Sequence, residues 1–583
     1  MLSLNTGDTG FVMLCTALVC MMTPALALFY GGMVRKKNVL TIMMQNFISM
    51  GVTAIIWIFG GFSLAFGPDV GGLFGDISYH FALDKVGIAP SPVYASTVPF
   101  ILFFAYQLMF AVIAPALITG AFAGRLNFRG YLKFLILWMI FIYIPVCHWI
   151  WGGGWLAQLG FHDFAGSCAV HMVGGTAAFI GAKILGPRIG KYTKDGKARA
   201  IPGHSLTLGA LGVFILWFCW FGFNGCSTVA LTDGAADVAA RVFVTTNLAA
   251  AVATVTVMCI TWVRYKKPDV SMTLNGSLAG LVAITAGCDA VTPVGAAIIG
   301  IIAGFVVVFG IEFVDQKLKV DDPVGAVGVH GLCGLTGTLL TGVFAYYLTD
   351  DLGQPLGLLY GGGVHFLGVQ VLGIVSVLAW VGVTMVIIFQ AIKHTIGLRV
   401  TEAEEISGLD LPEHGLTSAY ADFMPVPTTV LGTRAGEAAA LANQTAAPAA
   451  AVPVTRVQTE QAEGKPTAIH KVVIITNQSR FEALKNAMNE IGVTGMTVIQ
   501  AAGCGMQKGA PEYYRGVPVE ATLLPKVKLE LVVSAVPVET VVEAARRALY
   551  TGHIGDGKIF VYDVADVIKI RTGETGYDAL QDD

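Results

Sequence analysis

Charged residues are scarce in this sequence. Asp, Glu, Lys and Arg make up 13% of the 583 residues, about half of the share found in soluble domains. The formal net charge is -3 and no long run of basic residues occurs, so we expect no nucleic-acid partner. Hydrophobic residues account for 55% of the chain. This combination indicates a membrane protein.

Three features that point to other classes of protein are also absent. The 10 cysteines form no Cys-x-x-Cys pair, so we expect free buried thiols, with neither disulfides nor a metal site in the apolar part. No GxxxxGK[ST] loop occurs, which argues against an ATP-driven pump. Residues 1–8 lack the basic region of a signal peptide, so we expect the first apolar segment to be a retained helix.

Apolar runs predict a polytopic all-α membrane part with eleven transmembrane helices. Basic residues follow the odd-numbered spans, whereas acidic residues occupy most of the alternate loops. Because basic loops stay on the cytoplasmic side, we expect the N-terminus outside and the C-terminus inside. The predicted spans are 10–32, 39–62, 98–123, 131–152, 163–186, 204–227, 239–263, 271–288, 294–314, 323–346 and 360–394.

One short pattern occurs twice. Asp163 begins a glycine-rich apolar stretch that reaches His171 eight residues later, and Asp322 precedes His330 in the same way. Eight helical residues rise roughly 12 Å, and half of the hydrocarbon core is about 15 Å thick. Each histidine is therefore expected near the membrane midplane. Span five enters from outside and span ten from inside, which predicts a 5+5 inverted repeat.

An ionisable side chain at that depth marks a transport path. Two imidazoles at matching positions predict a twin-histidine pore that guides a small amine or shuttles a proton. The alternative is a pair of buried histidines that only satisfy neighbouring polar groups. Asp163 and Asp322 are expected to cap helices. Asp163 also faces the outer mouth, where a carboxylate stabilises an incoming cation.

Aromatic residues accompany the predicted pore. Trp151 closes span four at the outer face, either as an interfacial anchor or as a cation–π platform for a small cation. Phe110, Trp220, Phe223 and Ser227 lie in spans three and six. Aromatic residues in apolar helices usually belong to the core, so the sequence alone gives these four no special standing.

The composition changes after residue 396. Residues 1–396 form the predicted membrane domain, and residues 397–432 form a charged cytoplasmic region. Residues 433–466 are rich in Ala, Thr, Gln and Pro, which is typical of a flexible linker. From residue 467, predicted strands and helices follow in the order βαββαβ, with VIKIR (567–571) as a further strand after KIFVYDV. This order indicates an α+β ferredoxin-like domain.

Several long patterns make residues 1–432 resemble the ammonium transporter (Amt/Mep/Rh) family. They are FYGGMVRKKNVL, WGGGWLAQLGFHDFAGSCAVHMVGG, WFGFNGCS, DDPVGAVGVHGLCG and GLRVTEAEEISGLDLPEHG. The resemblance implies a homotrimer of eleven-helix protomers, each with one pore for ammonium, ammonia or methylammonium. It further implies a recruiting site of Trp151, Phe110 and Ser227, a gate of Phe110 and Phe223, a pore lined by His171, His330 and Trp220, and recruitment and deprotonation supported by Asp163.

Residues 467–583 resemble the PII nitrogen-signalling proteins. The patterns are GVTGMTV, QKG, YYRG, LPKVKLELVV, TGHIGDGKIFVYDV and IKIRTGE. The resemblance implies regulation by bound effectors and a mobile loop with Arg515 that enters the cytoplasmic exit of a transporter. ADP or ATP is implied at Gly555, Asp556, Gly557, Lys558, Lys569 and Arg571. For 2-oxoglutarate, with Mg-ATP, the implied residues are Gln507, Lys508, Gly509 and Lys526.

Two departures from the PII pattern bear on its function. The family's KPF pattern after the first strand is replaced by Asn477-Gln478-Ser479, beside the implied effector site. The tyrosine that some members have uridylylated is replaced by Val519. We therefore expect regulation by metabolites without uridylylation.

Together these observations predict a transporter rather than an enzyme. It would move ammonium across a bacterial cytoplasmic membrane, with its N-terminus periplasmic and its own PII-like domain docking on the cytoplasmic face. No cofactor is expected for transport itself. The alternative is an ammonium sensor that signals through residues 397–432 to the PII-like domain, with transport secondary.

Overall fold

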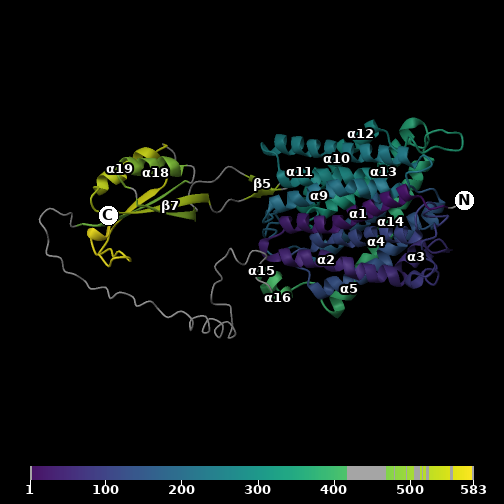
Figure 1. Ribbon diagram of the computed structural model, residues 1–583, viewed down its shortest axis with the longest axis horizontal. Coiled ribbons are helices and arrows are strands. Elements are labelled where there is room, and N and C mark those ends of the chain that lie inside the picture. The colour runs from purple at the N-terminus through teal and green to yellow at the C-terminus, as the bar shows by residue number, and fades with distance from the viewer. Residues whose placement is uncertain are drawn as a thin grey trace. The chain divides into compact units, whose positions relative to one another are not determined.

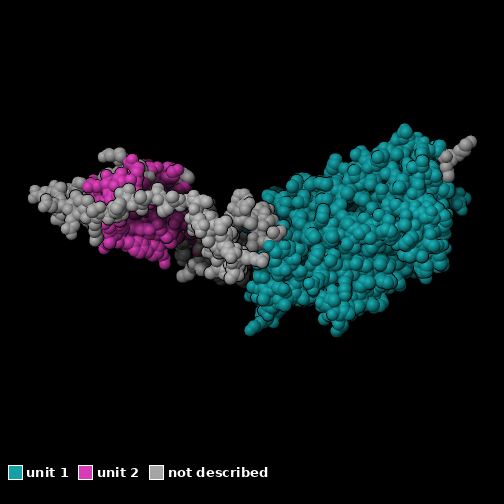
Figure 2. Space-filling view, turned by 60° about the horizontal axis from the view of Figure 1, so that its bottom comes forward, with its two compact units in different colours: residues 1–424, 513–519 teal, residues 425–512, 520–583 magenta. Residues whose placement is uncertain are grey.

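The computed structural model describes residues 3–415, 468–477, 480–493, 495–503, 512–514, 517–519, 524–551 and 556–580. The chain divides into two compact units (Figure 2). Unit 1 contains residues 1–424 and 513–519, and unit 2 contains residues 425–512 and 520–583. The proposed linker, residues 433–466, lies outside the described residues.

Unit 1 is built from long helices that run alongside one another (Figure 1). Its α-helices are α1 (Thr6–Met33), α2 (Val39–Ile56), α3 (Phe62–Phe66), α4 (Phe100–Thr119), α5 (Phe128–Trp138), α6 (Ile144–Trp151), α7 (Trp155–Gln158), α8 (Val173–Leu185), α9 (Leu206–Gly225), α10 (Ala235–Tyr265), α11 (Val270–Ile284), α12 (Pro293–Glu312), α13 (Cys333–Phe344), α14 (His365–Thr395), α15 (Glu402–Ser407) and α16 (Asp410–His414).

Shorter elements interrupt or join these helices. The π-helical turns are η2 (Trp57–Gly61), η5 (Met139–Tyr143), η6 (Ser167–Met172), η8 (Phe313–Lys317) and η9 (Val327–Leu332). The 3-10 turns are η1 (Lys36–Asn38), η3 (Phe81–Leu83), η4 (Gly120–Phe122), η7 (Cys226–Thr228) and η10 (Leu358–Tyr360). A small antiparallel hairpin consists of β1 (Asp69–Val70) and β2 (Phe74–Gly75).

Ten helical segments in the described part of the chain are long and apolar enough to cross a membrane. They are Thr6–Met33, Lys36–Phe66, Phe100–Phe122, Phe128–Gln158, Ser167–Leu185, Leu206–Thr228, Ala235–Tyr265, Pro293–Lys317, Val327–Phe344 and His365–Thr395. The remaining predicted span, 271–288, is the 15-residue apolar helix α11. Such a helix rises about 22 Å, which is shorter than the hydrocarbon core of about 30 Å. Length and composition therefore support ten spans and leave the eleventh as a shorter helix.

Short polar side chains set the starts of several helices. Each accepts a hydrogen bond from the backbone N–H three residues later, which satisfies one of the N–H groups that a helix start leaves unpaired. Pro293 then occupies the first position of α12, where its missing N–H costs nothing. The capping residues are Asn5, Asn127, Ser205, Asp269 and Thr292.

The two histidine-bearing segments cross at glycines. A Cβ atom added to Gly175 would lie 2.0 Å from the backbone nitrogen of Gly331, and one added to Gly334 would lie 2.8 Å from the backbone nitrogen of Met172. Only residues without a side chain allow backbones to approach so closely. The glycines that follow each histidine therefore set the separation of the two segments.

The charged region after α14 binds to helix starts of unit 1. The Asp410 carboxylate accepts hydrogen bonds from the backbone N–H groups of Leu40 (3.1 Å) and Thr41 (2.9 Å) in the first turn of α2. The Glu413 carboxylate accepts one from Phe128 (3.2 Å), the first residue of α5. Carboxylates are stabilised at helix N-termini by unpaired N–H groups and by the helix dipole. Residues 402–414 are therefore fixed to the membrane-spanning part.

Unit 2 is a four-stranded antiparallel sheet with two helices. Its strands are β3 (His470–Asn477), β4 (Thr497–Gly503), β7 (Leu524–Val533) and β8 (Lys558–Asp563), in the spatial order β4-β7-β3-β8. Its helices, α18 (Phe481–Glu490) and α19 (Val538–Leu549), share a core with β3 and β7 that includes Leu484, Leu529 and Val541. The short strands β5 (Glu512–Tyr514) and β6 (Val517–Val519), which fall almost entirely in unit 1, pair with each other. The βαββαβ order agrees with the expected ferredoxin-like fold.

The expected strand 567–571 is not formed. An isolated bridge joins Ile568 to Thr575, and Gly573 donates a backbone hydrogen bond to Lys569. Gly573 adopts a φ of 77°, which favours a turn over an extended strand. The β-branched pattern of VIKIR therefore forms one side of a tight turn.

We predict that Gly175→Ala destabilises unit 1 by about 3 kcal/mol or more, because the new methyl group overlaps the Gly331 backbone. The matched control is Gly368→Ala in α14, where nothing lies within 4 Å of an added Cβ. The measurement is the temperature at which the purified protein loses its monodisperse peak in detergent. Equal temperatures for both variants would show that the glycine crossing does not limit stability.

Candidate functional site

His171 and His330 face each other as stacked rings. Their centroids lie 5.2 Å apart with an interplanar angle of 15°, and the residues are 1% and 2% exposed. Both ring nitrogens of His171 and Nδ1 of His330 have no hydrogen-bond partner within the described part of the chain. Buried polar groups are costly unless paired. These nitrogens can therefore bind a small polar molecule that donates or accepts hydrogen bonds.

Each histidine lies in a π-helical turn, η6 or η9, and an aspartate four or five residues before that turn accepts hydrogen bonds from N–H groups at its start. The glycine three residues after each Asp adopts a positive φ, 116° at Gly166 and 85° at Gly325. This shared local geometry matches the repeated sequence pattern. The Asp163 carboxylate accepts backbone hydrogen bonds of 2.8–2.9 Å from Gly166, Cys168 and Ala169. The Asp322 carboxylate accepts them from Val324, Gly325 and Val327.

Aromatic rings continue from the histidine pair to Trp151. His171 stacks on Trp220 with centroids 5.1 Å apart and lies 5.8 Å from Phe223. Phe223 lies 4.3 Å from Phe110, and Phe110 meets Trp151 edge-on at 5.8 Å. Ring faces attract cations, and Trp151 is the partly exposed member of this column, so its ring can attract a cation at that end.

Two further contacts complete this end of the column. Trp151 Nε1 donates to the backbone oxygen of Asp163 at 2.7 Å, and Ser227 Oγ donates to the backbone oxygen of Phe223 at 3.1 Å. The structure therefore brings together all eight residues proposed for the transport path, from Trp151 to His330.

Tyr30 and Thr285 are site residues that the sequence did not reveal. The Tyr30 hydroxyl lies 3.4 Å from His330 Nε2 and donates to the Leu117 carbonyl at 2.8 Å. Thr285 Oγ1 accepts the Trp220 indole N–H at 3.0 Å. In the sequence, the signals for these two residues were weak: Tyr30 lies in the FYGG pattern, and Thr285 is a polar residue at the end of an apolar helix.

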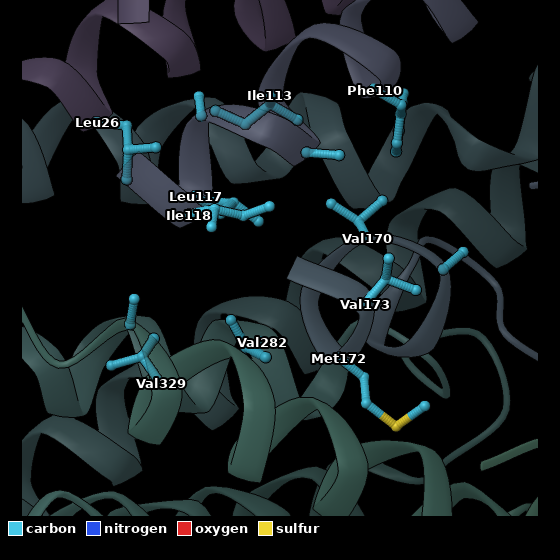
Figure 3. Close-up of a cluster of buried hydrophobic side chains, with 14 of the residues drawn as sticks. Leu26, Phe110, Ile113, Leu117, Ile118, Val170, Met172, Val173, Val282 and Val329 are labelled. Atoms are coloured by element: carbon cyan, nitrogen blue, oxygen red, sulfur yellow. The ribbon is translucent and has the colours of Figure 1, made fainter. Parts of the chain in front are cut away.

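Apolar side chains surround the histidine-bearing segments. Figure 3 shows Ile113 and Leu117 of α4 together with Val170 of η6, Val282 of α11 and Val329 of η9. All five are buried. In such surroundings a dehydrated ion is far more costly than a neutral molecule.

A buried ion cluster lies just before Asp322. The Asp321 carboxylate forms two bonds of 2.8 Å with the Arg188 guanidinium, and its backbone oxygen accepts one of 2.6 Å from Arg125. Burial alone would raise the pKa of Asp321, but the charges of Arg188 and Arg125 hold this pKa well below its usual value. Burial lowers the pKa of Arg125 to about 10. The cluster therefore stays ionised at neutral pH and fixes the chain before η9.

In unit 2, three of the candidate nucleotide residues, Asp556, Gly557 and Lys558, lie at the start of β8. The Asp556 carboxylate accepts the Thr551 N–H at 2.8 Å, and its backbone oxygen accepts the Thr476 hydroxyl at 2.9 Å. Gly557 has a φ of 126°, and a Cβ there would lie 2.0 Å from the Ile475 carbonyl oxygen. Asp556 and Gly557 are therefore held against the end of β3, and Lys558 follows them at the exposed start of β8.

Further effector residues are only partly described. Lys569 Nζ lies 3.7 Å from the Glu574 carboxylate, and Arg571 is exposed. Lys526 Nζ donates to the side-chain oxygen of Asn477, the first residue of the departure from the KPF pattern. Gly555, Gln507, Lys508, Gly509 and Arg515 lie outside the described residues.

Comparisons with known proteins match both parts of the chain. Residues 10–420 match the family model "Ammonium Transporter Family", and residues 469–574 match "Nitrogen regulatory protein P-II". An ammonium transporter of Bacillus subtilis is 41% identical over 421 residues, covering 72% of this chain and 100% of that protein.

Two solved structures are also similar. One is named Sensor Amt Protein, with 34% identity, a TM-score of 0.64, and coverage of 70% of this chain and 98% of that one. The other is Mep2 of Saccharomyces cerevisiae, with 31% identity, a TM-score of 0.61, and coverage of 68% and 88%.

We predict that Thr285→Val lowers the rate of ammonium uptake several-fold. The substitution leaves the buried Trp220 N–H without its acceptor, at a cost of about 1–3 kcal/mol, so the indole should no longer stay stacked on His171. The measurement is initial uptake into proteoliposomes with equal protein content. Thr254→Val in α10 is the control, because its hydroxyl donates to the Ala250 carbonyl of its own helix, one turn earlier. A Thr285→Val protein as active as this control would contradict the proposed role of Thr285.

Proposed function

The chain belongs to the ammonium transporter family and carries a P-II domain at its C-terminus, and we propose that it moves ammonium through a pore lined by His171 and His330. The family consists of transporters rather than enzymes, and the P-II domain is regulatory. The observation that carries this proposal is the stacked histidine pair, three of whose ring nitrogens are buried and have no hydrogen-bond partner among the described residues.

The proposed topology follows from the distribution of basic loops. α11 counts as an eleventh span, the N-terminus is periplasmic, and the P-II domain lies in the cytoplasm. The two Asp–His segments then enter from opposite faces as parts of an inverted repeat. Their matching caps and their glycine crossing support this arrangement.

Capture takes place at the outer end of the aromatic column. An ammonium ion is attracted by the face of Trp151, with the Ser227 hydroxyl and the ring of Phe110 beside it. Asp163 favours the cation by its charge, although its carboxylate is also engaged by three backbone N–H groups. Phe110 and Phe223, with ring centroids 4.3 Å apart, close the column below this point.

Ammonium loses its proton near the phenylalanine gate, either to water at the outer end of the column or to an unpaired ring nitrogen of His171, and passes the histidines as ammonia. The ammonium-evoked current tested below distinguishes the two routes. The apolar surroundings make the ion costly, whereas ammonia both donates and accepts hydrogen bonds. The nitrogens of His171 and Nδ1 of His330 provide the complementary groups. Trp220, held by Thr285, forms the wall beside His171.

The proposed regulation uses the second domain. Residues 1–396 transport ammonium, and residues 397–432 couple this membrane part to the P-II domain. Residues 433–466 tether the P-II domain, residues 467–583, which binds ADP or ATP at the Asp556–Lys558 loop. 2-Oxoglutarate binds near Lys526, together with Mg-ATP. A homotrimer of pores and a trimer of P-II domains can share one three-fold axis, and the tether holds them at roughly millimolar effective concentration. The P-II domain docks and undocks through the loop that contains Arg515.

A second candidate function is ammonium sensing with transport secondary. The name of one similar structure, Sensor Amt Protein, favours it. So does the coupling region of this chain, because Asp410 and Glu413 bind directly to the starts of α2 and α5. A change in the pore would then reach the P-II domain through residues 397–432.

We predict that changing both His171 and His330 to Phe lowers saturable ammonium uptake at least tenfold, because the path loses its hydrogen-bonding groups. Proteoliposomes would be assayed for ammonium-evoked current and, with an internal pH-sensitive dye, for flux. His365→Gln, at the exposed start of α14, is the matched histidine control. Undiminished uptake in the double variant would refute a path through this pair.

We predict that ADP and ATP, tested with and without 2-oxoglutarate, change the uptake rate of the full chain, and that Lys558→Ala abolishes this change. Lys485→Ala, on the exposed side of α18, should respond like the parent protein. Truncation after residue 432 separates the two functions. A transporter loses nucleotide control of uptake, whereas a sensor keeps its uptake and loses effector-dependent binding of cytoplasmic proteins.

A further inference from the structure

The loop that carries Asp163 is joined to the segment after α11 by hydrogen bonds. The backbone N–H of Phe164 donates to Ala286 at 3.0 Å, and that of Ala165 donates to Thr285 at 3.1 Å. The N–H of Ala286 donates in turn to Ser167 Oγ at 2.7 Å. Two segments, residues 162–167 (the first strip) and residues 285–289 (the second strip), therefore form one structural element, which we call the outer clamp.

The outer clamp touches the proposed transport path on both sides. Asp163 on the first strip caps η6, which contains His171. Thr285 on the second strip holds the Trp220 indole. A change in how the two strips meet therefore alters the positions of His171 and Trp220 together.

His162 and Asp289 fasten one end of the outer clamp. Their side chains meet through His162 Nε2 and Asp289 Oδ1 at 3.0 Å, and they remain 23% and 11% exposed. Gln370 of α14 fixes the backbone of His162 on both sides, accepting its N–H at 2.9 Å and donating to its carbonyl at 2.7 Å. The imidazole is thus held in place beside Asp289 while protons still reach it.

The charged groups around the His162 ring favour its protonated form. Asp289 faces it from the segment after α11, and Asp163 lies next to it on its own loop. Arg241 of α10 is directed to the backbone oxygen of Asp289, to which its Nε donates at 3.1 Å. The group that α14 presents is the neutral carboxamide of Gln370. Burial alone would lower the pKa of His162, but Asp289 and Asp163 outweigh it, so this pKa lies above its usual value.

We propose that His162 and Asp289 form a proton-dependent latch that positions the ammonium-capturing end of the transport path. His162 is a positioning residue, since it acts through the Asp163 loop and touches no substrate. The proposal rests on the proposed transport function and on the outward orientation of this face.

The direction of the pH effect follows from the partner of His162. A histidine whose pKa is raised by a partner stabilises the structure fully below its unfolded pKa of about 6.5. That stabilisation is lost as pH rises through the higher folded-state pKa. The latch is therefore strongest below about pH 6.5 and weakens as the pH rises through the folded-state pKa of His162, where the neutral imidazole keeps only an uncharged hydrogen bond to Asp289. Opening separates Asp163 from the Thr285 segment and weakens capture.

The test measures methylammonium uptake by the full-length protein in proteoliposomes. External pH is varied from about 6 to about 9 at constant internal pH, and KM and maximal rate are determined at each step. The informative variant is His162→Gln, because its amide still donates to Asp289 but does not titrate. We expect its KM to stay within about twofold across a range in which the parent KM rises several-fold, with maximal rates alike.

A second variant and a control sharpen this test. Asp289→Asn keeps an acceptor for His162 but removes the charge, so the rise in KM should move to lower pH. Asp69→Asn alters another His–Asp pair, Asp69 with His148 (2.9 Å). The other hydrogen bonds of these two side chains go to Ala65, Gly72 and Gln158, so the pH profile of this variant should match that of the parent. A His162→Gln profile that follows the parent at every pH would overturn the proposal.

A measurement on the parent protein covers the case of a variant that does not fold. Hydrogen–deuterium exchange of peptides from residues 162–170 and 283–291, corrected for the intrinsic pH dependence, should show loss of protection on the alkaline side. Unchanged protection would overturn the latch. Absence of saturable uptake by the parent would instead refute the proposed transport function, so the two failures are distinguishable.

Discussion

Close contact between two helical backbones is the constraint on which the proposed pore depends. Gly175, four residues after His171, lies against the backbone of Gly331, the residue directly after His330. Because no side chain separates the segments there, the two imidazoles come within stacking distance. The aspartate caps, the aromatic column and the Trp220 anchor are arranged around rings whose positions this crossing sets.

Much of this arrangement follows from the sequence because it depends on short-range patterns. The Asp–His spacing indicated paired segments, and the glycines after each histidine indicated close packing. Both are features of local sequence, and so is the βαββαβ order of the C-terminal domain. The roles of Trp151, Phe110 and Ser227 came only from family resemblance, because an aromatic residue in an apolar helix looks the same in a core and in a pore.

Other features depend on long-range contacts that no local pattern contains. Thr285 matters because Trp220, 65 residues away in the chain, donates to it. Tyr30 meets His330 across 300 residues. The apolar run 271–288 predicted a longer helix, but α11 ends at Ile284 and the chain turns into the outer clamp. VIKIR has the composition of a strand, but the glycines after it turn the chain before it can join the sheet.

The π-helical turns in η6 and η9 have a consequence for how this transporter tolerates insertions and deletions. A π turn contains one residue more than an α turn, and each residue of an α-helix advances by about 100° around the axis. If η6 relaxed to an α-helix, His171 would rotate away from His330 by roughly that angle, while Asp163 kept its cap. The same holds for His330 in η9. One extra residue per segment therefore sets the direction in which each histidine points around its helix axis. Deleting a single residue in η6 or η9 would abolish function while leaving the hydrophobicity of the span intact.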